Sequence, residues 1–202
     1  MNLALVTLEN DHNCEVVLHL NKIVLEKMKK ITTFDKVKFW SDGSSSQFRS
    51  QYTFYFMNFY DTNLRISWNF FEAHHGKGCV DGIGGIVKRT VFKKVLSNHV
   101  GIQGPEHFAN YANSILNKID VIFVEKVDYS LHEECRLNAK EVAGTLKVHY
   151  VLREKLLTPG HFKLKFFNTT ASGKLIAEKS YDTTNALGTW GNGDYTIQLS
   201  SA

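Results

Sequence analysis

Short β-rich runs alternate with helical patterns along the first 128 residues, and this alternation constrains the fold more than any other feature. The β-rich runs are residues 2–8, 37–40, 64–71 and 121–124. Between them, apolar side chains recur every three or four residues, as on one face of a helix, within residues 16–28, 48–59, 83–95 and 108–119. Strands that alternate with helices are typical of an α/β domain, so we expect a mixed sheet flanked by helices.

The pattern changes after about residue 129, where apolar and basic side chains alternate one by one. Such alternation is typical of antiparallel strands with one solvated face, and we expect strands over residues 146–153, 162–166 and 173–180. The end of the chain is rich in glycine. We therefore predict a core domain over residues 1–128, an appended antiparallel segment over 129–185 and a flexible tail over 186–202.

Composition limits the class of protein without identifying a partner. The chain has 202 residues and a formal net charge of +4, which permits a nucleic-acid partner and does not demand one. Cys14, Cys79 and Cys135 lie far apart, so we expect no disulfide framework and a reducing, intracellular compartment, either nucleus or cytoplasm. No apolar run approaches the roughly 20 residues that span a bilayer, so no membrane partner is expected.

Asp42 is the first candidate for chemistry, because it follows the β-rich run that contains Trp40 and precedes Gly43. The carboxyl ends of strands face the crevice where α/β sheets place their ligands. A strand-end aspartate is also a common helix cap, and the serines at 44–46 are compatible with a helix start here. Spacing alone favours the cap over the catalytic role.

Asp81 is the second candidate, at the predicted start of the helix that follows the strand over 64–71. Together with Asp42 it would place two carboxylates toward one sheet edge. Two-metal phosphoryl transfer requires such a pair, since it holds two divalent ions about 3.5–4 Å apart. If the site is active, Mg²⁺ or Mn²⁺ is the expected cofactor. Without a partner carboxylate, a helix cap is the better interpretation of Asp81.

A glycine-rich loop over residues 74–85 leads into this helix. The histidines of the loop and Cys79 lack a second pair of ligands at suitable spacing, so a structural zinc site is not favoured. We expect His75 to orient a phosphate or a water instead. The glycines allow either close approach to a phosphate or tight helix–strand packing. Basic side chains in and after the loop are either solvated or neutralise the phosphates of DNA: Lys77, Lys88, Arg89 and Lys93.

Two segments resemble the signatures of a group of uncharacterised animal proteins, which look like relatives of DNA transposases with a ribonuclease H-like core. Residues 39–49 (Phe-Trp-Ser-Asp-Gly-Ser-Ser-Ser-Gln-Phe-Arg) resemble the signature Ser-Asp-Gly-x-x-Ser-Gln-Phe-Lys. Residues 68–89 resemble the signature Trp-x-Phe-Phe-x-x-x-His-Gly-Lys-x-x-x-Asp-Gly-x-Gly-Gly-x-Val-Lys-Arg. The resemblance implies a ribonuclease H-like fold, in which three acids hold the metal ions.

Residue by residue, the resemblance assigns the second of these acids to Asp42 and the third to Asp81, with Glu72 as a weaker rival. His75 and Lys77 match the His-Gly-Lys element. The first acid of this fold lies on its first strand, which has no counterpart here, because the opening strand and helix resemble the third strand and first helix of the core. The resemblance therefore implies a core truncated at its N-terminus, without one metal ligand.

In a site with two of three acids, metal-dependent strand cleavage is expected to be lost or severely weakened, so the favoured function is a catalytically inactive, transposase-derived remnant that at most binds DNA. Two alternatives stay open. One is an active nuclease or transposase completed by a partner chain or by upstream sequence, and the other is a protein-interaction module with no nucleic-acid role. The missing strands would expose a sheet edge, through which a homodimer can form.

Overall fold

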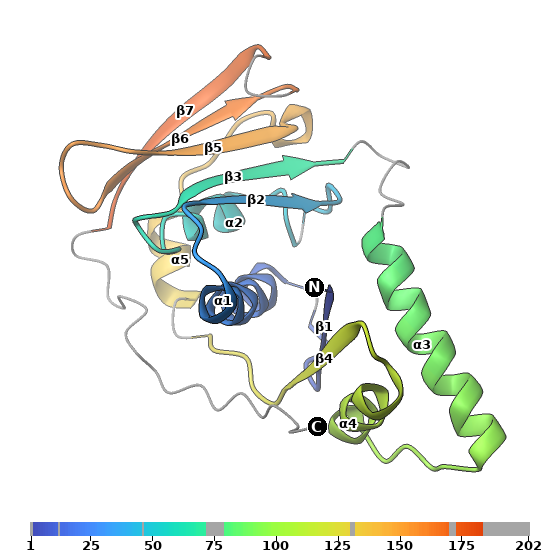
Figure 1. Cartoon of the computed structure of the whole chain (residues 1–202). Coiled ribbons are helices and arrows are strands. Elements are labelled where there is room, and N and C mark those ends of the chain that lie inside the picture. The colour runs from blue at the N-terminus through green and yellow to red at the C-terminus, as the bar shows by residue number, and fades with distance from the viewer. Residues whose placement is uncertain are drawn as a thin grey trace. The chain divides into compact units, whose positions relative to one another are not determined.

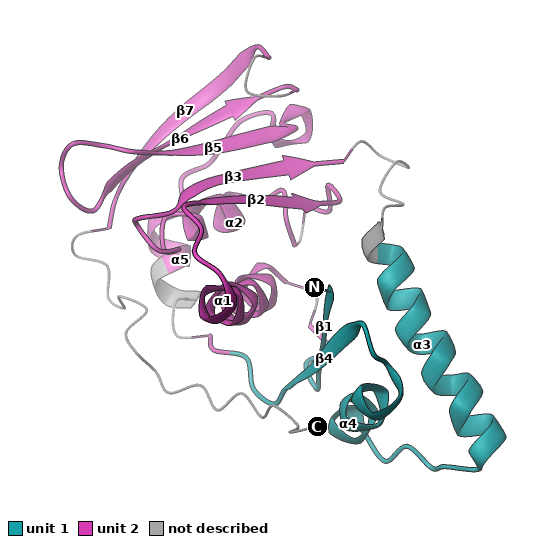
Figure 2. Ribbon diagram, viewed as in Figure 1, with its two compact units in different colours: residues 1–10, 77–127, 194–202 teal, residues 11–76, 128–193 magenta. Residues whose placement is uncertain are grey.

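The computed structural model describes residues 2–11, 13–45, 47–71, 79–129, 132–169 and 173–183, with only the backbone described for residues 79–80 and 132–134. The chain forms two compact units (Figure 2): unit 1 comprises residues 1–10, 77–127 and 194–202, and unit 2 comprises residues 11–76 and 128–193. Each unit has its own hydrophobic core. No helix in the described ranges is long and apolar enough to cross a membrane.

Unit 1 is a two-stranded parallel sheet with helices packed against it. Its elements in chain order are β1 (Asn2–Thr7), α3 (Cys79–Asn98), α4 (Pro105–Ile115) and β4 (Ile119–Val124). β1 and β4 pair along their whole length, and Val91 and Ala112 of the helices are completely buried in the core. Pro105 occupies the first turn of α4, as predicted, where its missing N–H has no intrahelical partner to lose. Ile119, predicted to close the inner face of this helix, begins β4 instead.

Unit 2 is built on a mixed sheet of five strands. From edge to edge these are β2 (Lys36–Ser41), β3 (Arg65–Phe70), β5 (Tyr150–Lys155), β6 (His161–Phe167) and β7 (Leu175–Asp182). β2 and β3 run parallel, and every other neighbouring pair is antiparallel. The strands beyond residue 129 therefore continue the sheet of β2 and β3, and the predicted mixed α/β architecture is confirmed at this level.

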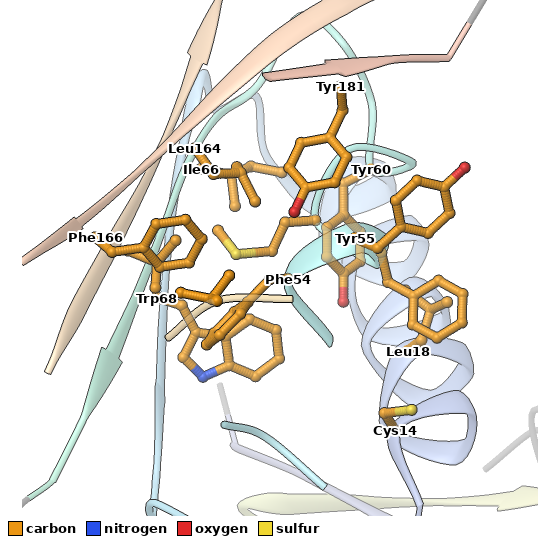
Figure 3. Packing of buried hydrophobic residues seen from close by; sticks show 14 of the residues in the cluster. Cys14, Leu18, Phe54, Tyr55, Tyr60, Ile66, Trp68, Leu164, Phe166 and Tyr181 are labelled. Carbon is orange, nitrogen blue, oxygen red and sulfur yellow. The ribbon is translucent and has the colours of Figure 1, made fainter. Parts of the chain in front are cut away.

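Three helices of unit 2, α1 (Cys14–Ile31), α2 (Gln51–Phe56) and α5 (His132–Asn138), lie on the same side of this sheet (Figure 1). Figure 3 shows the buried side chains between helices and sheet, where the rings of Phe54 and Phe166 meet with their centroids 5.0 Å apart. The helix predicted over 48–59 is shorter than expected, because turns precede and follow α2. The sequence pattern did not predict α5.

β5 has the opposite inward face from the one that its apolar alternation suggests. Val151 and Arg153 are buried against the helices, while Tyr150 and Leu152 are half-buried on the other face of the sheet. The residues before β5 also differ from the prediction, since Thr145–Lys147 form a short 3-10 helix, η1, and no strand. Arg153 can face inward because its guanidinium finds hydrogen-bond acceptors there, so the charge does not need water.

Candidate functional site

Asp42 lies immediately after β2 and stabilises a turn. Its Oδ1 accepts a hydrogen bond of 2.9 Å from the backbone N–H of Ser44, and the Asp42 carbonyl accepts one of 2.9 Å from the Ser41 hydroxyl. The next helix, α2, is capped by Ser50, whose Oγ accepts from the N–H of Thr53 at 3.1 Å. The carboxylate is exposed and stabilises a local turn. Asp42 is therefore not the N-cap of α2, which corrects one alternative for this residue.

The buried Arg49 fastens this turn to the sheet. Its Nη1 donates a hydrogen bond of 2.9 Å to the Leu146 carbonyl, and its guanidinium carbon lies 5.1 Å from the centroid of the Phe70 ring. Burial lowers the pKa of Arg49, and the negative charge of Asp42 opposes that shift. A Cβ on Gly43 would lie 2.6 Å from Arg49 Nη2, so no side chain fits at that position without displacing the guanidinium.

The same turn connects the two segments that carry the resemblance. Trp68 Nε1 donates a hydrogen bond of 2.9 Å to Ser41 Oγ, which in turn donates to the Asp42 carbonyl. Trp68 and Phe70 belong to the second signature segment, whereas Ser41, Asp42 and Arg49 belong to the first. These contacts hold the end of β2 against β3. They give the matched residues a structural role that does not depend on metal binding.

Asp81 is exposed in the first turn of α3, where its negative charge favours the helix N-terminus. It belongs to unit 1 and Asp42 to unit 2, so neither unit contains the predicted carboxylate pair. Among the residues that the structure describes, no group of three or more His, Cys, Asp and Glu side chains is arranged to hold a metal ion. The predicted contributions of Glu72, His75 and Lys77 lie outside the described residues.

α3 presents its basic side chains away from the core of unit 1. Val87 and Val91 are buried, as predicted, and the side chains exposed on the helix include Lys88, Arg89, Lys93 and Lys94. Asp81 is the one acidic residue among the 20 residues of the helix. Exposed apolar side chains lie among the basic ones, namely Ile86, Phe92 and Leu96. This surface combines positive charge with apolar area.

A second surface, which sequence reasoning missed, is the face of the five-stranded sheet opposite α1, α2 and α5. No described α-helix of unit 2 lies on it (Figure 1). We call it the open face. Strand register aligns one residue from each of four neighbouring strands across it: Trp40, Asn69, Tyr150 and Phe167. Three of the four are aromatic, and we call this set the aromatic row. The signal in the sequence was the run of Lys36, Lys38 and Trp40, each two residues after the one before, which places all three on one face of β2.

Comparison with curated proteins and with solved structures gave no match. A family model described as a domain of unknown function, DUF8701, matches residues 1–158. The match includes α3, the turn at Asp42 and the strands β1 to β5, and it ends between β5 and β6. Since the matched region is most of the 202 residues, the chain belongs to the DUF8701 family.

Proposed function

We propose that this chain is a nucleic-acid-binding domain related to ribonuclease H-like DNA transposases, and that it binds DNA without cutting it. The observation that carries the proposal is the exposed basic surface of α3. Lys88, Arg89 and Lys93 project from a helix with a single acidic residue. A cluster of exposed basic side chains attracts phosphates and releases their counterions, which is the main source of sequence-independent DNA affinity.

The order of elements supports the relationship to transposases. β2 ends at Asp42, α2 and β3 follow, and α3 begins with Asp81 in its first turn. This is the order in which the resemblance expects the second and third acids of a ribonuclease H-like core. The surroundings of Asp42 support binding without cleavage, because its Oδ1 accepts from Ser44 and the Arg49 cation is electrostatically coupled to it. Both features compete with a divalent ion for the carboxylate.

The test is the salt dependence of binding to a short fluorescent DNA duplex, followed by anisotropy. We compare the wild-type chain with a triple variant, Lys88→Ala, Arg89→Ala and Lys93→Ala. Each lost phosphate contact lowers the slope of log K against log salt by about 0.9, so the triple variant should lose about 2.7. Lys30→Ala is the matched control, since Lys30 is also exposed near one end of a helix and belongs to unit 2.

Two results would contradict the proposal. Equal slopes for the wild-type chain and the triple variant would remove α3 as the DNA contact, provided that both melt alike by circular dichroism. Nicking of plasmid DNA with Mg²⁺ or Mn²⁺ that disappears in Asp42→Ala would instead favour an active nuclease.

A further inference from the structure

The open face has an unusual arrangement of aromatic and basic side chains, fixed by strand register. Lys38 lies two residues before Trp40 on the same face of β2, opposite Ser67 of β3. Lys36 lies two residues before Lys38, opposite Arg65. Side chains on one face of a strand are about 6.6–6.8 Å apart, so Lys36 to Trp40 extend about 13 Å along the edge of the sheet. Lys36, Lys38 and Trp40 are therefore neighbours along the edge strand β2, and the adjacent residues of β3 on this face, Ser67 and Asn69, are buried beside them.

The aromatic side chains on this face are available for contact. Trp40 is 58% exposed although it belongs to a strand, and its ring centroid lies 5.3 Å from that of Phe71, the residue after β3. Tyr150 and Phe167 are half-buried and their ring centroids lie 5.8 Å apart. The planes of the Trp40 and Phe71 rings are tilted by 32° to one another, and the exposed tryptophan next to the second ring forms an apolar platform. Such platforms accept planar ligands with π-faces.

The positive charge of the open face is concentrated on the side of β2. On β6, Lys165 lies 2.8 Å from a carboxylate oxygen of Glu154, and Lys163 lies 3.6 Å from one of Glu178. These two lysines are thus neutralised within the sheet. On β2, Lys38 is exposed and has no ion pair with any residue that the structure describes. Lys36 is exposed beside the ion pair of Arg65 and Asp35.

We propose that the open face binds single-stranded nucleic acid, with bases stacked on Trp40 and phosphates held by Lys36 and Lys38. The partner must be negatively charged to complement β2, and it must carry exposed planar groups to use the aromatic row. Single-stranded nucleic acid meets both requirements, whereas the bases of a duplex have their faces covered by neighbouring bases. The inference rests on the proposed function for the class of partner, but it uses residues of unit 2 and none of α3.

The experiment measures binding of a labelled oligothymidine by anisotropy, with Trp40→Thr and Lys38→Gln as test variants. Loss of one stacking contact should raise the Kd by about 5- to 140-fold in Trp40→Thr. Trp40→Phe keeps a ring and should recover most of the affinity. Lys38→Gln should lower the salt slope by about 0.7. Lys174→Gln, an exposed lysine just before β7, is the matched control and should leave binding unchanged.

The outcomes separate this inference from the proposed function. If Trp40→Thr and Lys38→Gln bind the oligonucleotide like the wild-type chain, while the α3 triple variant loses duplex binding, the open-face site is wrong and the proposed function stands. If the wild-type chain binds neither duplex nor oligonucleotide, both fail. If light scattering shows a dimer that Trp40→Thr converts to a monomer with unchanged oligonucleotide affinity, the open face is an interface between copies, which also overturns the inference.

Discussion

Replacing Arg153 by methionine should destabilise unit 2 more than any surface substitution, because this side chain organises the connection between α2 and β3. Arg153 is 5% exposed, and its guanidinium carbon lies 4.9 Å from the centroid of the Phe162 ring. Its two terminal nitrogens donate four hydrogen bonds of 2.7–2.9 Å to the backbone carbonyls of Met57, Tyr60, Asp61 and Leu64. Burial lowers the pKa of Arg153 to about 10, so the group is still charged at neutral pH.

The expected magnitude follows from two opposing contributions. A hydrogen bond from a charged group is worth about 1.5–3 kcal/mol, so four of them contribute about 6–12 kcal/mol. Removing the charge also relieves the cost of burying it, which is several kcal/mol. Methionine fills much of the same volume, so no large cavity remains. We therefore expect Arg153→Met to lower the free energy of unfolding by about 3–5 kcal/mol, a large fraction of the stability of a typical domain.

Urea denaturation followed by circular dichroism measures this loss. Lys155→Met is the matched control, because Lys155 is exposed two residues further along β5 and should change stability by less than about 0.5 kcal/mol. Hydrogen exchange should also become faster across residues 57–64 in Arg153→Met, since these carbonyls lose their shared donor. If Arg153→Met shifts the urea midpoint no more than Lys155→Met does, the four hydrogen bonds are not what holds this connection.

Three further predictions concern buried or close-packed positions. Gly43→Ala should lower the free energy of unfolding by about 1–3 kcal/mol in thermal melts, since its Cβ would clash with Arg49. Gly82→Ala in α3, where a Cβ would have open space within 4 Å, should raise it by about 0.5–1 kcal/mol. Two changes of the same sign would contradict this reasoning. Burial lowers the pKa of His19 below 6.5, so the unfolded chain binds more protons below that pH and stability should fall as the pH drops; His19→Asn should flatten the urea midpoint between pH 5 and 6.5, and an unchanged slope would argue against it. Burial raises the pKa of the Cys14 thiol to about 12, so mass spectrometry should find Cys14 unmodified by iodoacetamide in the native chain and alkylated in urea, and rapid native labelling would show that the helix opens.

Most strands and helices could be predicted from the periodicity of apolar residues, because that signal is local. The run over 2–8 is β1, the helical pattern after Asn13 is α1, and the inward valines of α3 are buried. The prediction of the inward face of β5 was wrong for a non-local reason. Its inward face is decided by four carbonyls about 90 residues earlier in the chain, which the alternation of side chains cannot reveal. α5 was not predicted, because its seven residues are mostly polar and show no helical spacing of apolar side chains.

In the candidate site, too, local features could be predicted from the sequence and long-range contacts could not. The position of Asp42 at a strand end and of Asp81 at a helix start could be predicted from local pattern. The partners of Asp42 could not, since Arg49 reaches the turn only because it packs between Phe70 and the Leu146 carbonyl. The aromatic row was missed for a related reason. Its members are separated by up to 127 positions and become neighbours only through the register of four strands.

The interleaving of the two units has a consequence for biosynthesis. β1 cannot pair until β4 has been made, because Asn2 lies opposite Ile119, and the inner edge of β3 waits for Tyr150, which lies opposite Asn69. In the nascent chain β1 therefore stays unpaired, and β3, which can already pair with β2, keeps one edge unpaired until β5 emerges; neither unit can be completed before the other has begun. Every described element of unit 1 is complete by Val124, so unit 1 can fold while β5, β6 and β7 of unit 2 are still being synthesised. Closing loops as long as the one between β1 and β4 should make folding slow.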